Sequence, residues 1–261
     1  MNILEKEMVV ILKHLRDNYG VFEIKAEFEA EGSRMDEMMR LKDVTSAVGL
    51  PIIFKIGGVE AVTDIYSALQ IGVKGIVAPM AETPFALSKF LAMIDTIVAK
   101  DNAEDIDFAF NLETITAYEK MDEMFALPKI NLLHSMTIGR VDLTGSMGVG
   151  RAGVESSQVF DICRNAFIKA RAKGLKCALG GAISTQTIPF IEKLNKEKLV
   201  DKFETRKVVF RSDAVKYGEA AFLKAVEFEL LWLKSKKRYY SGIQIEDDHR
   251  IQMLSARLGK K

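Results

Sequence analysis

Short apolar runs alternate with longer amphipathic segments along most of the chain, and this alternation restricts the possible folds more than any other feature. Runs such as Pro51–Lys55 (PIIFK) and Gly75–Ala78 (GIVA) have the length of buried strands. Segments such as Thr83–Ala99 carry apolar residues at helical spacing, with Thr83 and Pro84 suited to a helix start. Strands separated by helices indicate βαβ units and a parallel sheet.

The number of these units selects among parallel folds. About eight units in 261 residues favour a single-domain (β/α)8 TIM barrel over an open doubly wound sheet. We expect strands at 21–25, 51–55, 75–78, 107–112, 131–138 and 176–179, and one or two more within 203–210. We expect helices at 34–48, 61–71, 83–99, 115–126, 155–172, 185–194 and 219–235.

The end of the chain changes character after the helix expected at 219–235. From about residue 236 the sequence SKKRYYSGIQIEDDHR is polar and less periodic, which indicates a polar tail. The preceding helix carries more large apolar residues than one stripe can hold: Phe222, Phe228, Leu230, Leu231 and Trp232. We therefore expect a homo-oligomer that covers the second face. The alternative is that the tail folds back over it.

Composition excludes several classes of function. The net charge of +1 provides no global field for nucleic acid or an anionic membrane, and no apolar run is long enough to span a bilayer. Cys163 and Cys177 form no disulfide framework and no metal-binding spacing. The N-terminal segment reads as an amphipathic helix instead of a signal peptide. We expect a cytoplasmic protein that acts on a small molecule.

Carboxylates follow two successive expected strands. Glu113 comes directly after 107–112, and Asp142 follows the strand expected at 131–138 within the sequence GRVDL. Functional groups of a parallel barrel sit at the carboxyl ends of its strands, so the two carboxylates can converge on one hard cation. Mg²⁺ or Mn²⁺ accepts such a site, with substrate oxygens and waters as further ligands. The alternative is that both residues are helix caps or surface charges.

The same region resembles a known family. The run from Asn111 to Gly148, NLETITAYEKMDEMFALPKINLLHSMTIGRVDLTGSMG, is similar to the signature of the HpcH/HpaI aldolase and citrate lyase β-subunit family. Weaker similarity extends upstream through IIFKIGGVEAVTDIYSALQIGVKGIVAPMAET. Together the two segments are about half of the chain. The family belongs to the pyruvate-type TIM-barrel enzymes, so the resemblance implies the same barrel.

The resemblance also implies an activity. It makes Glu113 and Asp142 the metal ligands and a 2-oxo acid such as pyruvate the ligand of that metal, with the turn amides of Gly139, Arg140 and Val141 holding its carboxylate. The implied enzyme is a metal-dependent class II aldolase, a lyase that cleaves or forms a 4-hydroxy-2-oxo acid through an enolate. Alternatives are citrate-lyase-like cleavage of a 3-hydroxyacyl thioester and a catalytically weak 2-oxo-acid-binding barrel. Members of the family often exchange their final helix between subunits, so the resemblance allows the same exchange here.

Lys55 ends the second expected strand, where the family usually has arginine. As a catalytic residue it can stabilise negative charge developing on the enolate oxygen, although lysine lacks the planar fork of arginine. Two alternatives remain. Lys55 can be a strand-end lysine that reaches to solvent, or it can form a Schiff base.

The first expected strand departs furthest from the family. Phe28 falls near the position of the family's histidine base, and Glu27 matches an acidic position that can hold a metal-bound water. We expect Glu27 or Glu29 to replace the missing base if burial raises its pKa. The alternative is a solvated acidic loop. His134 is expected to be a structural histidine of the barrel.

Three further positions are candidates for substrate binding. Gly180 and Gly181 end the sixth expected strand and allow close approach of a ligand, although they can also form a simple tight turn. Arg206 can hold a phosphate or a second carboxylate, or it can form a salt bridge with a neighbour such as Glu204. Arg151 can also reach an anion.

Overall fold

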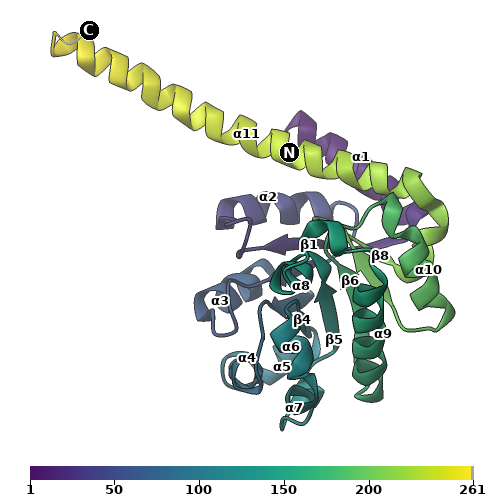
Figure 1. Ribbon diagram of the computed structural model, residues 1–261. Coiled ribbons are helices and arrows are strands. Elements are labelled where there is room, and N and C mark those ends of the chain that lie inside the picture. The colour runs from purple at the N-terminus through teal and green to yellow at the C-terminus, as the bar shows by residue number, and fades with distance from the viewer. Residues whose placement is uncertain (260–261) are drawn as a thin grey trace.

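The computed structural model describes residues 1–259, and its centre is a closed barrel of eight strands in sequential order (Figure 1). The open-sheet alternative is therefore wrong. The strands are β1 (Val21–Glu27), β2 (Ile52–Lys55), β3 (Gly75–Ala78), β4 (Asp107–Leu112), β5 (Ser135–Gly139), β6 (Lys176–Gly180), β7 (Lys202–Glu204) and β8 (Val208–Arg211).

Helices surround the barrel, and most begin where the sequence predicts. Thr83 caps α4 with Pro84 in its first turn, and Ser184 caps η3, a 3₁₀ turn that leads into α10. The α-helices are α1 (Ile3–Tyr19), α2 (Met35–Ser46), α3 (Val62–Ile71), α4 (Pro84–Ile97), α5 (Lys100–Glu104), α6 (Ile115–Glu119), α7 (Met121–Phe125), α8 (Arg140–Ser146), α9 (Ser157–Ala172), α10 (Ile188–Lys196) and α11 (Gly218–Arg257). The 3₁₀ turns are η1 (Ile130–Leu132), η2 (Arg151–Gly153), η3 (Thr185–Thr187) and η4 (Ser212–Tyr217).

The last strand departs from the expected βαβ pattern. Strands β1 to β7 pair in parallel, but β8 is antiparallel to both β7 and β1. Only Thr205, Arg206 and Lys207 separate β7 from β8. A parallel crossover needs a dozen or more residues, so this turn can only produce a hairpin. The hairpin closes the barrel in place of an eighth parallel unit.

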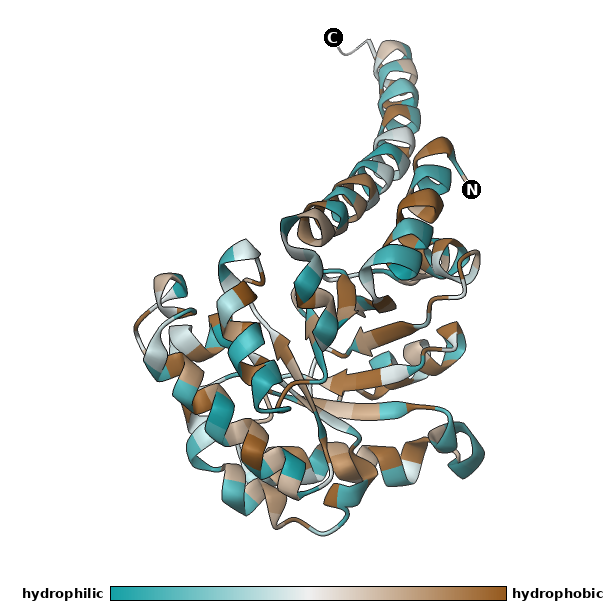
Figure 2. Ribbon diagram, turned by 90° about the vertical axis from the view of Figure 1, so that its right-hand side faces the viewer, coloured by the Kyte–Doolittle hydropathy of each residue, from teal (hydrophilic) through white to brown (hydrophobic). Residues whose placement is uncertain are grey.

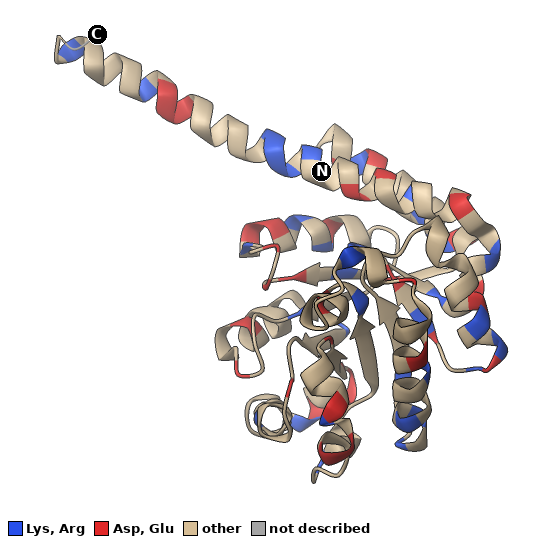
Figure 3. Cartoon of the chain, viewed as in Figure 1, with Lys and Arg blue, Asp and Glu red and all other residues tan. Residues whose placement is uncertain are grey.

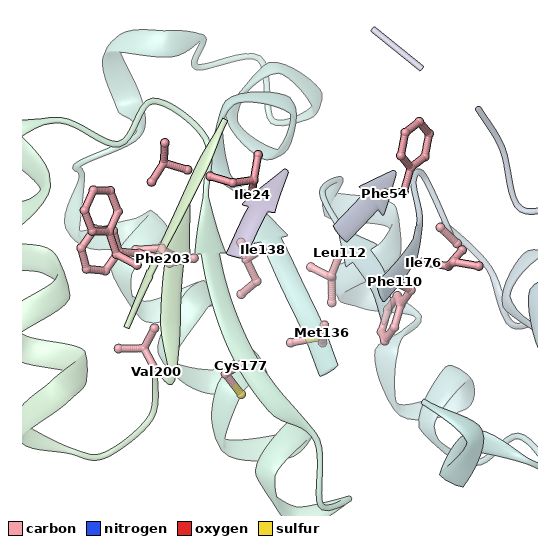
Figure 4. Packing of buried hydrophobic residues seen from close by; sticks show 14 of the residues in the cluster. Ile24, Phe54, Ile76, Phe110, Leu112, Met136, Ile138, Cys177, Val200 and Phe203 are labelled. Atoms are coloured by element: carbon pink, nitrogen blue, oxygen red, sulfur yellow. The ribbon is translucent and has the colours of Figure 1, made fainter. Parts of the chain in front are cut away.

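The hydrophobic core lies between the barrel and its helices. Alternate strand residues point outward into this layer, among them Phe54, Phe110, Met136 and Phe203 (Figure 4). Each of them is at most 1% exposed. The layer is continuous around the barrel, and it holds the strand ends in fixed positions.

The intervening strand residues face the inside of the barrel, and their side chains are mostly small or polar. Ion pairs cross this interior at two levels: Lys202 lies 2.9 Å from Glu23, and Lys25 lies 2.6 Å from Glu204. Both pairs join β1 to β7. Alternation therefore explains why a buried strand such as β1 contains charged residues at every second position.

The segment from about residue 236 is not the weakly periodic tail that the sequence suggests. Instead α11 continues without a break to Arg257 and extends away from the barrel (Figure 1). The fold-back alternative is therefore wrong. Apolar residues recur along the extended half, so its helical face is partly hydrophobic (Figure 2). Within the described residues, no helix combines the length and apolar character needed to cross a bilayer.

Candidate active site at the barrel mouth

A cavity of about 680 Å³ opens at the carboxyl ends of the parallel strands. Its walls come from the ends of strands β1, β2 and β4 to β7 and from the start of α11. The sequence-predicted residues that line it are Glu27, Glu29, Lys55, Glu113, Gly139, Val141, Asp142, Arg151, Gly180, Gly181 and Arg206. The fold therefore brings most of the predicted site together.

Glu113 lies at the centre of this site and is almost completely buried. One carboxylate oxygen accepts a hydrogen bond from the Met80 amide at 3.0 Å, and the other accepts one from the Asn111 side chain at 3.0 Å. A Cβ atom on Gly139 would lie 2.6 Å from the Glu113 carboxylate, so glycine is required beside it. Burial raises the pKa of Glu113, although the nearby Lys55 ammonium opposes this effect.

Asp142 has a different environment. It lies in the first turn of α8, directly after β5, and its side chain is exposed to the same cavity. Among residues 1–259, no three His, Cys, Asp or Glu side chains form a metal-binding group. A metal ion bound between Glu113 and Asp142 would therefore take its other ligands from substrate and water. That ligand set is all oxygen and suits Mg²⁺ or Mn²⁺.

Lys55 is a buried cation surrounded by carboxylates. Its ammonium group forms an ion pair with Glu29 and lies 3.4 Å from Glu27. Burial alone would lower the pKa of Lys55, but Glu113, Glu29 and Glu27 together outweigh burial and raise it. Lys55 therefore carries a positive charge at neutral pH. It neither snorkels to solvent nor has the lowered pKa that an imine-forming lysine needs.

The acidic segment after β1 is ordered by ion pairs and is not a solvated loop. One buried oxygen of Glu27 accepts no hydrogen bond within residues 1–259, and its nearest cation is Arg206 at 3.3 Å. Phe28 points away from the site, because its ring packs on Phe54 with centroids 4.1 Å apart. Phe28, which the sequence places near the expected histidine position, thus packs against the core instead of facing the cavity.

The glycine pair and the Arg140 turn form one unit. Gly181 has a left-handed φ of +80°, and a Cβ atom there would lie 2.6 Å from the Arg140 nitrogen and 2.7 Å from that of Val141. The close approach that glycine permits is therefore between two loops. The Arg140 side chain points out of the cavity, and only the backbone of its turn borders the site.

Arg140 clamps these loops from behind and is fully buried. Its guanidinium donates to the carbonyl oxygens of Gly180, Gly181 and Val154 and to the Glu155 carboxylate at 3.0 Å. A bidentate group with five donors suits this role better than lysine would.

Other candidates are placed as follows. Arg206 pairs with Glu27 and Glu31, each at 3.3 Å, so it forms salt bridges but not with Glu204. Arg151 lines the cavity and has no ion pair among the described residues. His134 precedes β5 at the opposite end of the barrel, where its ring accepts a hydrogen bond from the Phe108 amide, as expected of a structural histidine.

Sequence reasoning missed several residues of the mouth. Lys25 and Glu204 line it as a pair, and Glu219 and Glu229 enter it from α11. The strand alternation of β1 could have indicated Lys25, but no local pattern identifies Glu219 or Glu229. With them included, seven carboxylates and four basic side chains line the cavity. This excess of negative charge favours a bound cation.

The fold defines a closed α/β barrel with a cavity at the carboxyl ends of its parallel strands, and comparisons with known proteins identify similar structures. Searches of family models and of curated proteins found no match. A structure of citrate synthase SbnG matches with 15% identity and a TM-score of 0.62 over 90% of each chain.

Two further structures match the barrel. An HpcH/HpaI aldolase/citrate lyase family protein from Burkholderia cenocepacia J2315 has 13% identity and a TM-score of 0.61, covering 92% of this chain and 90% of its own. An HpcH/HpaI aldolase from Desulfitobacterium hafniense DCB-2 has 13% identity and a TM-score of 0.59, covering 74% and 80%. The resemblance to this family is confirmed at the level of the fold.

Proposed function

We propose that this protein is a divalent-metal-dependent carbon–carbon lyase that cleaves or forms a 4-hydroxy-2-oxo acid. The observation that carries the proposal is the placement of Glu113 and Asp142 after adjacent strands on one cavity whose lining is predominantly acidic. A 2-oxo acid is an anion, so an acidic cavity accepts it only together with a cation. The similar structures named as aldolases and a citrate synthase support a lyase-type reaction.

The side chains divide the work of such a reaction. Glu113 and Asp142 would hold Mg²⁺ or Mn²⁺, and the bound metal would supply Lewis-acid polarisation of the keto group. Ionisation of Glu113 is disfavoured by burial, so an adjacent cation restores its charged form. Lys55 remains protonated and supplies a second positive charge near the reacting oxygen. The turn at Gly139, Arg140 and Val141 borders the position for the substrate carboxylate.

A second candidate function is a catalytically weak barrel that binds a 2-oxo acid. The lack of an evident general base favours it, because none of the three histidines lines the mouth and the partly buried Phe28 packs against Phe54. Glu27 and Glu29 can serve as the base only when their ion pairs with Lys55 rearrange. In this function, ligand binding is retained but turnover is very slow.

Calorimetry separates these possibilities. The expected result is that Mg²⁺ or Mn²⁺ binds, that pyruvate binds only in its presence, and that Glu113→Gln and Asp142→Asn abolish both. A coupled assay then measures pyruvate release from 4-hydroxy-2-oxo acids. Release that requires metal supports the lyase, whereas metal-dependent binding without release supports the weak barrel. Unchanged metal affinity in both variants would reject the site itself.

Borohydride trapping tests the remaining alternative. Because Lys55 keeps its proton, reduction in the presence of pyruvate should leave it unmodified. Mass spectrometry of the intact chain and of the Lys55 peptide provides the measurement. A reduced pyruvate adduct on Lys55 would make this a Schiff-base enzyme.

A further inference from the structure

The long helix α11 has two apolar faces, and the protein itself covers only one of them. The face with Ala221, Phe222, Ala225, Phe228 and Trp232 is buried against the barrel and α1. The last side chains that tie α11 to the body are Lys236, which lies 2.9 Å from Glu37, and Tyr240, whose hydroxyl donates to Glu37. Beyond Tyr240 the helix projects into solvent (Figure 1).

The second apolar face is a regular seam. Its positions recur at alternating intervals of three and four residues from Leu223 to Leu258, which is the a/d pattern of a heptad repeat. The middle of the seam is polar, and its two ends are apolar. The apolar members, each 43% to 68% exposed, are Leu223, Val226, Leu230, Leu233, Ile251, Leu254 and Leu258. Lys237, Tyr240, Gln244 and Asp247 occupy the a/d positions between them.

We propose that this seam pairs with the same seam of a second copy as an antiparallel two-helix coiled coil centred on Gly242. A repeat of 3.5 residues keeps one face in contact over such a length because the helices supercoil gently. In this register the apolar end of one helix faces the apolar end of the other. Leu230 meets Leu254 of the second copy, Leu233 meets its Ile251, and Val226 meets its Leu258.

The polar centre selects this register. Lys237 faces Asp247 of the second copy, so opposite charges meet twice across the twofold axis. A parallel pair would place Lys237 beside Lys237 and Asp247 beside Asp247, which is unfavourable in a coiled-coil core. A shift by one heptad would place Leu230 opposite Asp247 and Leu233 opposite Gln244. The parallel pair thus places like charges together, and the shifted pair places apolar residues against polar ones.

Charges beside the seam agree with the same register. Helix α11 carries a basic run at 234–238, just before the projecting half, and an acidic run at 246–248 within it (Figure 3). Antiparallel pairing brings Lys234 beside Asp248 of the second copy and Glu229 beside its Arg257. Lys236 approaches Arg250 of the second copy, but Lys236 is already neutralised by Glu37. Gly242 is level with the twofold axis, but it lies on the face of the helix opposite the seam and makes no contact with the second copy.

The pairing also reaches the candidate active site. Leu223 and Val226 belong both to the seam and to the cavity lining. Leu258 of the second copy therefore lies at the rim of the mouth, against Val226. Each barrel packs mainly on a different face of its own helix, the one that carries Ala225, Phe228 and Trp232. The proposed dimer thus has two mouths, each bordered by the helix tip of the other copy.

Multi-angle light scattering and sedimentation of the full chain test the proposal. The expected mass is twice the chain mass of 29.2 kDa at micromolar concentration. Leu254→Lys, which lies on the projecting half and touches nothing in its own body, should weaken dimerisation at least about tenfold, since a buried charge is costly. Ile245→Lys is the matched control, because Ile245 is 54% exposed on the same helix but outside the seam. It should leave the dimer intact.

Charge reversal and cross-linking test the register. Lys237→Asp and Asp247→Lys should each weaken the dimer, and the double variant should restore it. Ser241→Cys should cross-link the two copies readily on oxidation, whereas Leu233→Cys should not, because those positions lie far apart in an antiparallel pair. A monomeric wild-type chain, equal effects of Leu254→Lys and Ile245→Lys, or Leu233→Cys cross-linking would each overturn the proposal. Far-ultraviolet circular dichroism verifies that every variant retains its helices.

Discussion

At the scale of single residues, the barrel mouth concentrates charges that burial makes costly. Glu113 is 2% exposed and Lys55 is 8% exposed, and each modifies the pKa of the other. The surroundings stabilise the charged form of Lys55 more than the charged form of Glu113. Lys55 has three carboxylates near it. Glu113 accepts hydrogen bonds from two neutral donors, and its nearby cation, Lys55, is shared with Glu27 and Glu29. The ionised form of Glu113 therefore reduces the stability of the folded state.

This cost leads to a prediction for Glu113→Gln. The pKa of Glu113 is raised in the folded state, so its ionised form destabilises the protein at neutral pH. Below the ordinary glutamate value of 4.5 the carboxyl is protonated in both states and the cost disappears. The variant should therefore unfold at a higher temperature near neutral pH, by about 2–4 °C for each kcal/mol gained.

Thermal unfolding followed at several pH values measures the effect. The gain should shrink as the pH falls and should vanish below the ordinary glutamate range. Asp142→Asn is the control, because Asp142 is exposed and its removal relieves no buried charge. A lower unfolding temperature for Glu113→Gln near neutral pH would contradict the prediction and would show that Glu113 supports the fold.

At the scale of secondary-structure elements, the site depends on how neighbouring loops are held together. The α8 turn and the β6–η3 loop meet through glycine, and the buried Arg140 fixes both from behind. The Arg140 guanidinium also lies over the ring of Phe190, 4.8 Å from the ring centroid. Four separate segments therefore depend on one guanidinium.

We predict that Arg140→Met destabilises the protein by about 3–5 kcal/mol, because it leaves Glu155 and several carbonyl groups without their buried partner. Urea denaturation measures the loss. Arg164→Met is the control, since Arg164 pairs with Glu197 at the surface and such pairs contribute about 1 kcal/mol or less. Similar losses in both variants would refute the clamp.

The elements also show what a sequence can predict. The placement of Glu113, Asp142 and Lys55 on one cavity could be predicted, because strand ends are local features and the parallel barrel gathers them at one mouth. The pairing of Lys25 with Glu204 joins residues far apart in the chain, so no local pattern reveals it. The direction of β8 follows from a three-residue turn that resembles an ordinary break in an apolar run.

The projecting half of α11 was misread for a different reason. Its seam is interrupted by Lys237, Gln244 and Asp247, so a short window shows only a polar segment. The heptad spacing becomes visible when both apolar ends are compared across the whole helix. The heptad spacing over the whole segment predicts a continuous helix, whereas local hydrophobicity does not.

At the scale of the whole molecule, the protein consists of a barrel body and one projecting helix (Figure 1). Every side chain that ties α11 to the body lies at or before Tyr240. The barrel should therefore fold without the projecting half. The helix tip and the body are separate in their contacts, although they belong to one continuous helix.

We predict that a chain ending at Ser241 unfolds within about 1 kcal/mol of the full chain when both are compared as monomers, because surface changes away from the core have small effects. The comparison uses chemical denaturation, with Leu254→Lys as the full-length reference at a concentration where light scattering shows it to be monomeric. A loss of several kcal/mol on truncation would show that the projecting half supports the barrel.

Closure of the barrel by β8 also affects how the chain is synthesised. β1 and β8 are neighbours in the barrel but lie near opposite ends of the barrel sequence, with Val21 opposite Phe210. During translation, the edge of β1 that pairs with β8 remains unpaired until nearly all of the barrel has left the ribosome. An unpaired strand edge is a site for unwanted association, so this interval is when the nascent protein is most exposed to aggregation. Because β8 needs no crossover helix before it, the three-residue hairpin turn shortens that interval by the time needed to translate a helix.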